Sequence, residues 1–274
     1  MKTTTKIIIG LAIFTFIILE SSMVYTSLYL HTPIYTMAQE KNVAIISTVL
    51  EEFTSLKFKE ENMFISNSDN VTFRIIQNDS ISDPYICYPE NIIDYLRIEN
   101  INGSLIFSLI DKDQTDEAYR YSISIIDPIT IFTSSMPDSI SNEISNILEI
   151  SGQSRRNMFI KTSGPLKFEN MEADSLYLTG KINPYRDKNM CFIFNNTNIE
   201  TIEVNNFYGP IKIISDSLSS VRNFTVYGPD DYRQNLTLNS LRIDQFSFIP
   251  GKSNSDFILT GNEAFTTSFN TRLP

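Results

Sequence analysis

The residue types that most often carry out catalysis are scarce in this chain. His31 is the only histidine among 274 residues, and it lies beside a predicted membrane segment. A His-based triad and a metal site with several histidine ligands are therefore excluded. The sequence also lacks the glycine-framed motifs of serine hydrolases, P-loop enzymes and dinucleotide-binding proteins. We expect no catalytic residue, no cofactor and no metal site, and hence no enzymatic activity.

Carboxylates are plentiful, and one acidic segment invites a calcium interpretation. Residues 111–117 read DKDQTDE, and hard cations bind clusters of carboxylate oxygens. The segment fails the EF-hand pattern, because Asp116 stands where the invariant glycine is needed and Ser122 where the bidentate glutamate belongs. A solvated hairpin loop explains it better. Carboxylates that face each other in a cleft would leave a carbohydrate-active enzyme as an alternative.

Three tyrosines are the candidate ligand-facing residues. Tyr177, Tyr208 and Tyr227 each lie near the end of a repeated segment. If these side chains point outward they could stack on sugar rings, because a tyrosine has a flat apolar body and a polar tip. They could instead point inward as an aromatic stack, and the sequence leaves both orientations open.

The charge balance excludes one large class of partner. The formal net charge is −10 and the isoelectric point is near 4.7, so a phosphate backbone would be repelled rather than neutralised. We expect no nucleic-acid binding. The two cysteines, Cys87 and Cys191, lie far apart in the sequence. We expect buried free thiols rather than a disulfide, since one isolated pair is not a disulfide framework.

The N-terminus predicts export. Lys2 and Lys6 precede an apolar run that resumes after Glu20 and continues to residue 30. As a helix, residues 7–30 would extend about 36 Å, enough to cross a hydrocarbon layer of about 30 Å. A cleaved signal peptide is the alternative, although no A-x-A-like cleavage site follows the run. In both cases the basic start places the remaining chain outside the cytoplasm.

Short alternating apolar runs with polar turns between them begin at residue 53 and predict an all-β domain. Residues 33–52 are expected to form a membrane-proximal connector, helical in part. The first runs after residue 53 predict an antiparallel meander, with a two-residue hairpin turn at Asn102-Gly103.

A repeated phrase in the second half of the chain predicts a stacked architecture. TIEVNNFYGP, which begins at Thr201, is followed by SSVRNFTVYGP. Recurrence at roughly twenty residues is typical of solenoids, in which each short strand buries alternate side chains on the coil below and asparagine turns the corners. An ordinary β-sandwich is the alternative. Aligning the hydroxyl-plus-apolar phrase predicts a common register for Ser175-Leu176, Thr201-Ile202, Ser220-Val221 and Ser240-Leu241.

The same residues resemble the GIN-domain family, described as the head domain of candidate auto-transporter adhesins and common in Bacteroidetes. Three strand patterns carry the resemblance, and they are formed by Phe53, Leu56 and Phe58; by Phe73, Ile75 and Gln77; and by Asn102, Gly103, Leu105 and Phe107. The family's repeated Ser-Gly steps are sparse here. The resemblance covers the chain from about residue 53 onward, and it implies an exported, right-handed β-helix-like fold with an adhesin role.

Together these observations predict three segments and one main function. Residues 1–32 form a transmembrane signal anchor, 33–52 the connector and 53–274 a β-solenoid ectodomain outside the cytoplasm, either periplasmic or at the cell surface. We expect an adhesin-like binding or scaffolding module of the cell envelope, with an envelope protein or a glycan as partner. The alternatives are a partner or sensor subunit of an envelope-stress membrane complex and, less favoured, a carbohydrate-active enzyme.

The predicted anchor can be tested by cell fractionation. If residues 7–30 stay uncleaved, the mature protein should begin at or near Met1 and remain with the membranes after a carbonate wash, because a spanning helix is not extracted by high pH. N-terminal sequencing that begins beyond Ser22 would show a cleaved signal peptide instead.

Overall fold

The structure is a computed structural model that describes residues 34–38, 43–61, 71–110, 120–125, 127–144, 147–180, 190–205, 207, 209–228, 234–251, 257–261 and 268–271. Most of these residues form strands. The elements are β1 (Ile34–Ala38), β2 (Ile45–Val49), β3 (Ser55–Glu61), β4 (Thr72–Gln77), β5 (Tyr85–Pro89), the 3-10 helix η2 (Glu90–Tyr95), β6 (Leu96–Ile101), β7 (Ser104–Ile110), β8 (Arg120–Ser124), β9 (Ile129–Thr133), β10 (Ser139–Asn142), β11 (Ile147–Thr162), β12 (Leu166–Gly180), β13 (Met190–Asn195), β14 (Asn198–Asn205), β15 (Ile211–Ser215), β16 (Ser220–Tyr227), β17 (Gln234–Asn239), β18 (Arg242–Ile249), β19 (Phe257–Gly261) and β20 (Ser268–Thr271).

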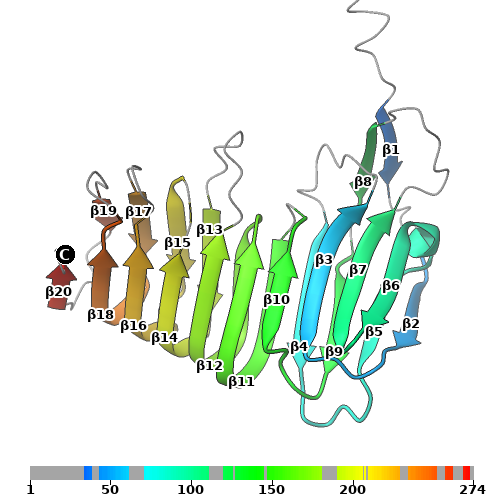
Figure 1. The fold of residues 1–274 in the computed structure, drawn as a ribbon, viewed down its shortest axis with the longest axis horizontal. Helices are drawn as coiled ribbons and strands as arrows, with labels where there is room; N and C mark the ends of the chain where they lie inside the picture. Colours follow the sequence, from blue (N-terminus) through cyan, green and yellow to red (C-terminus); the bar gives the residue numbers. More distant parts are fainter. Residues whose placement is uncertain are drawn as a thin grey trace, which may run out of the picture.

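The strands form two stacks that share one core. Stack A contains, in spatial order, β2, β5, β9, β4, the first halves of β11 and β12, β13, β15, β17 and β19. Stack B contains β6, β7, β3, β10, the second halves of β11 and β12, β14, β16, β18 and β20. Figure 1 shows the strands of stack B side by side from β6 to β20.

Beyond residue 139 the chain passes alternately from one stack to the other, and each strand pairs in parallel with the strand one coil later. Leu176 pairs with Ile202, Ile202 with Phe224 and Phe224 with Phe246. This parallel pairing agrees with the recurrence of the repeated phrase, and the solenoid itself stays a prediction. The right-handed sense of the coil stays a prediction.

The predicted register is correct for the first two phrases and wrong for the last two. Ser175 pairs with Thr201 as expected, but Ser220 pairs with Asn198 and Arg242. The cause is the spacing of the buried side chains. In the coils of β12, β14, β16 and β18 the second inward side chain comes three positions after the first, and the third comes two positions after the second, as in Ile199, Ile202 and Val204. Val221 occupies the first of these inward positions, not the second.

The predicted meander is only partly present. The Asn102-Gly103 hairpin is confirmed, because β6 and β7 are antiparallel and both turn residues have positive φ, at 53° and 79°. The strands β3 and β4, however, pair in parallel with β7 and β9. The coil that they form lies between the β7–β9 coil and the β10–β11 coil, so the first coil in sequence is the second in space.

The connector is not helical where it is described. β1 pairs with β8, and β2 pairs with β5 at the edge of stack A. A strand at this position is favoured because β5 offers an open ladder of backbone groups next to it. The predicted anchor lies outside the described residues, and within those residues no helix is long and apolar enough to cross a membrane.

Phenylalanine side chains from successive coils stack on one another inside the molecule. The ring centroids of Phe58 and Phe107 lie 5.3 Å apart, and those of Phe168 and Phe194 lie 5.2 Å apart. In each pair the two residues are register partners on neighbouring strands, so the parallel pairing itself brings the rings together. The core is one continuous cluster along the coil axis.

Alternation along β14 makes a matched pair of substitutions. Val204 is 1% exposed and points into the core, whereas the next residue, Asn205, is exposed. Val204→Asp should lower the free energy of unfolding by about 3 kcal/mol or more, because an unpaired carboxylate would be buried between coils. Asn205→Asp should change it by about 0.5 kcal/mol or less. Thermal melts of the two full-length variants measure the difference, and equal melting temperatures would contradict the assignment of these faces.

Candidate binding surface

The predicted tyrosines do not line the core. Tyr177 lies between Leu176 and Leu178, which are 0% and 1% exposed, so its side chain points to the outer face of stack B. Tyr227 follows the buried Val226 and is half-buried on the same outer face. Tyr208 lies outside the described residues. Of the two orientations left open by the sequence, the outward one is correct for Tyr177 and Tyr227.

An aromatic pair forms the most exposed part of this face. The rings of Phe159 and Tyr177 are register partners on β11 and β12, and they stack with centroids 4.9 Å apart and planes inclined by 17°. The Phe159 side chain is 53% exposed. A large apolar ring at this exposure loses the benefit of burial unless something covers it. The pair, here called the platform, is therefore an apolar patch on an otherwise polar surface.

Uncharged polar side chains border the platform on one side. The row there runs through the paired strands and has no charge among its described side chains, which are those of Asn157, Ser175, Thr201, Asn223 and Gln245. The row that includes the platform continues through Glu203 to Thr225 and Ser247. Hydroxyl and amide groups can both donate and accept hydrogen bonds. The face thus combines apolar rings with groups able to bind neutral polar ligands.

Glu203 is the one acidic residue among these two rows, and it interacts with Tyr227. Burial raises the pKa of the Tyr227 phenol above its ordinary value. The negative charge of Glu203, the hydrogen bond with its carboxylate and the nearby Tyr177 raise the pKa of Tyr227 further. The carboxylate and the two tyrosines therefore form one local cluster.

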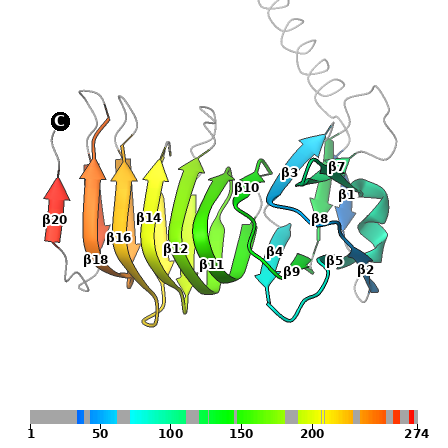
Figure 2. The ribbon, with the colours of Figure 1, turned by 60° about the horizontal axis from the view of Figure 1, so that its bottom comes forward.

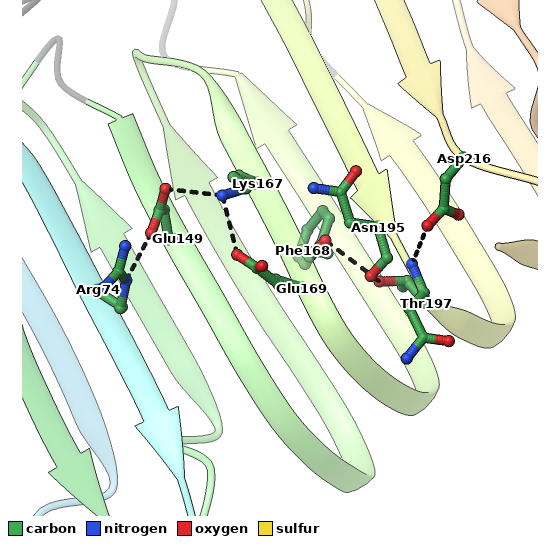
Figure 3. A network of polar contacts seen from close by, with 9 residues as sticks. Arg74, Glu149, Lys167, Phe168, Glu169, Asn195, Thr197 and Asp216 are labelled. Atoms are coloured by element: carbon green, nitrogen blue, oxygen red, sulfur yellow. Dashed lines mark hydrogen bonds and ion pairs between the residues drawn. The ribbon is translucent and has the colours of Figure 1, made fainter. Parts of the chain in front are cut away.

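The outer face of stack A contrasts with this surface. Arg74 Nε donates to Glu149 Oε2 at 2.6 Å, and Lys167 Nζ bridges Glu149 and Glu169 at 3.2 and 2.9 Å (Figure 3). The hydrogen bond to Glu169, together with that to Glu149, raises the pKa of the Lys167 ammonium. These charges are satisfied within the protein, so this ladder offers few groups to a ligand.

Two connected hollows, of about 500 and 400 Å³, lie along the corner where the chain passes from stack A to stack B. The small side chains of Ser154 and Ala173 occupy the corner position that Ile199 fills in the next coil, and all three contribute to the walls. The carboxylates there are solvated or paired, since Glu200 binds Arg222 at 2.8 Å. An exposed, ion-paired carboxylate is poorly suited to act as a general acid, and the hollows give no support to a carbohydrate-active enzyme.

At this corner, hydrogen bonds of Gln77 attach the coil formed by β3 and β4 to the coils on either side of it. Gln77, a residue of the second family pattern, accepts a hydrogen bond from the Gln153 N–H at 2.9 Å and donates to the Ser134 carbonyl at 3.0 Å. Gly152 has a φ of +128°, and a Cβ there would lie 2.6 Å from the Gln77 Cβ. The glycine is needed both for its backbone conformation and for the close approach of Gln77. This corner therefore serves the fold.

Neither cysteines nor metal ligands form a site in the described residues. Cys87 and Cys191 are free and half-buried, and burial raises the pKa of both thiols. The expectation of free thiols is confirmed, although they are less buried than predicted. No group of three His, Cys, Asp or Glu side chains in the described ranges could hold a metal ion. His31 and the acidic segment 111–117 lie outside those ranges.

No family model and no curated protein matches the chain, and three solved structures that match it do so at TM-scores below 0.5. A candidate lipid-binding protein from Parabacteroides distasonis has 14% identity and a TM-score of 0.48, covering 87% of this chain and all of its own. A candidate adhesin from Bacteroides fragilis has 12% identity and a TM-score of 0.40, covering 86% of this chain and all of its own. Another, from Parabacteroides merdae, has 10% identity and a TM-score of 0.39, covering 87% and all of its own. These likenesses assign no activity, and membership of the GIN-domain family stays a prediction.

Sequence reasoning missed Phe159 because the residue lies outside the repeated Tyr-Gly-Pro phrase. The signal was nevertheless present. Phe159 lies between Met158 and Ile160, which are 0% and 1% exposed, so the alternation of this strand already places the ring on the outside. A large apolar residue at an outward position is the feature to look for in such a coil.

The cluster around Tyr227 predicts an abnormal titration. We expect a pKa above the ordinary value of about 10 for the Tyr227 phenol, and a lower one in Glu203→Gln, because the charge of Glu203 opposes ionisation. Since folding raises this pKa, its contribution to stability is complete below about pH 10 and is lost as the pH rises through the folded-state pKa. Carbon NMR of ¹³Cζ-labelled tyrosine, assigned with Tyr227→Phe, measures both titrations. An unchanged pKa in Glu203→Gln would contradict the contact.

Proposed function

We propose that the protein is a membrane-anchored binding module of the cell envelope, a right-handed β-solenoid whose outer stack B face binds glycans. The stacked and exposed Phe159–Tyr177 pair is the observation that carries this proposal. The apolar faces of sugar rings pack on aromatic side chains, and sugar hydroxyls need partners that donate and accept hydrogen bonds. Both requirements meet on this one face.

The distribution of charge favours a neutral sugar over a charged ligand. The row that borders the platform on one side has only hydroxyl and amide side chains from Asn157 to Gln245. A strongly charged ligand would find no ion-pair partner in that row, and removing it from water would be costly. A neutral glycan loses much less free energy when it leaves water, because hydrogen bonds to the protein take the place of its hydrogen bonds to water.

The architecture supports attachment rather than catalysis. Successive coils repeat the outward positions at the strand spacing of about 4.8 Å, so a long ligand can contact several coils at once. Parallel pairing with a continuous core makes this surface rigid, which limits the entropy lost on binding. The N-terminal anchor predicted from residues 7–30 would tether the surface to the envelope.

A glycan array probed with the full-length protein in detergent tests the proposal. We expect binding to neutral glycans, and about tenfold weaker binding by Tyr177→Ala or Phe159→Ala, equivalent to about 1.4 kcal/mol. Loss of the stacking surface is the reason. Lys212→Ala, at an exposed position on the outer face of stack A, is the control away from this face and should bind like the wild type.

Two results would contradict glycan binding by this face. One is the absence of any bound glycan at micromolar protein, with the protein folded by circular dichroism. The other is equal binding by wild type, Tyr177→Ala and Lys212→Ala, which would place the glycan elsewhere on the molecule.

A further inference from the structure

The strand at the N-terminal end of stack A has an open edge. β2 pairs with β5 on one side, and no described strand lies on its other side. It forms one end of the molecule, opposite β20 (Figure 1, Figure 2). An edge strand of this kind presents a row of backbone groups that can pair with another chain.

The backbone groups that face the open edge can be identified from the existing bonds. The Leu50 N–H donates to the Pro84 carbonyl at 2.8 Å, and the Glu90 N–H donates to the Ala44 carbonyl at 2.9 Å. In an antiparallel ladder the bonded positions alternate. The even-numbered residues of β2 therefore bond to β5, while Ile45, Ser47 and Val49 direct their N–H and C=O groups outward.

The edge of β2 lacks the protection that edge strands usually have. Its sequence, IISTV, contains no charge and no proline, whereas β6 at the same end of stack B has Arg97 and Glu99. Charges, prolines and bulges are the usual means by which proteins prevent edge pairing. Ile45 and Val49 are 51% and 73% exposed, so the edge is also apolar.

An apolar row on the outer face of stack A runs to this edge and stops there. Ile76 pairs with Phe132, Phe132 with Tyr85, and Tyr85 with Val49. The rings of Tyr85 and Phe132 stack with centroids 4.7 Å apart. Val49 is the last and most exposed member of the row. A further apolar side chain beside it would continue the row and remove Val49 from water.

We propose that β2 pairs with β2 of a second copy, antiparallel and centred on Ser47, to form a two-fold symmetric dimer. In this register Ile45 of each copy lies opposite Val49 of the other, so the exposed apolar side chains cover each other. The outward N–H and C=O groups of Ile45, Ser47 and Val49 all find partners. No charge in β2 opposes a like charge, because the strand has none. The strand is self-complementary, as a two-fold interface requires.

Disulfide trapping in intact cells that express the full chain tests the dimer. In a Cys87→Ser, Cys191→Ser background, Ser47→Cys would bring two cysteines opposite each other with Cα atoms about 5.5 Å apart, within the range for a disulfide. We expect a species of twice the monomer mass on a non-reducing gel after mild oxidation. Ser217→Cys, at an exposed turn, is the matched control and should stay monomeric.

Charge pairs added to the Ser47→Cys chain test the register. Ile45→Lys with Val49→Lys would place like charges opposite each other at both ends of the strand pair and should abolish the trapped dimer. Ile45→Lys with Val49→Glu would place opposite charges there and should retain it. Melting temperatures show whether both variants fold.

Two outcomes would overturn the proposal. If Ser47→Cys remains monomeric at wild-type expression, the edge is covered by the chain before β1 or by another protein. If the two charge variants are trapped equally, the copies do not pair in this register.

Discussion

The spacing of inward side chains at the corner between the stacks is the constraint on which the rest of the structure depends. The coils of β12, β14, β16 and β18 each bury one side chain at the corner and two more along stack B, at intervals of three and two residues, as in Val221, Phe224 and Val226. In β11 a register shift after Ser154 lengthens the first interval to four residues. Phe53, Leu56 and Phe58 repeat this spacing at the N-terminal end. Parallel in-register pairing requires the same spacing in neighbouring coils, because a slip of one residue would turn core residues to solvent. The core thereby fixes which side chains can reach a ligand.

Because the core is shared, the two outer faces can differ without cost to it. On stack A the ladder of Arg74, Glu149 and Lys167 pairs its charges across coils, and Glu149 accepts from both cations. Neutral groups link neighbouring coils at the corner. The Thr197 hydroxyl donates to the Phe168 carbonyl at 3.2 Å (Figure 3), and Asn196 Nδ2 donates to Asn170 Oδ1 at 2.8 Å. These contacts stabilise the coil.

Local signals predicted more of this fold than long-range ones. Alternation predicted the strands, and positive φ at Asn170 and Asn196 agrees with asparagine at the corners. The parallel pairing of β3 with β7 could not be predicted, because alternation is the same in parallel and antiparallel strands. The register slip at Ser220 has a similar cause, since a serine precedes an inward residue at two different positions of the coil. In the candidate site, the sequence left open whether the tyrosine side chains point outward or inward. Only the pairing of β11 with β12 shows that Phe159 lies beside Tyr177.

The two proposed surfaces are compatible because they lie on opposite stacks. A two-fold axis through Ser47, perpendicular to stack A, turns the second copy without inverting its faces. Both outer faces of stack B, each with its Phe159–Tyr177 platform, then point to the same side of the dimer. A glycan-bearing surface could therefore meet two platforms at once, and the second contact would be intramolecular once the first had formed. Stacking on a single platform is worth only about 1 kcal/mol beyond burial. Pairing through β2 would therefore raise the apparent affinity for a surface that repeats the glycan, although each platform makes the same contacts as in the monomer.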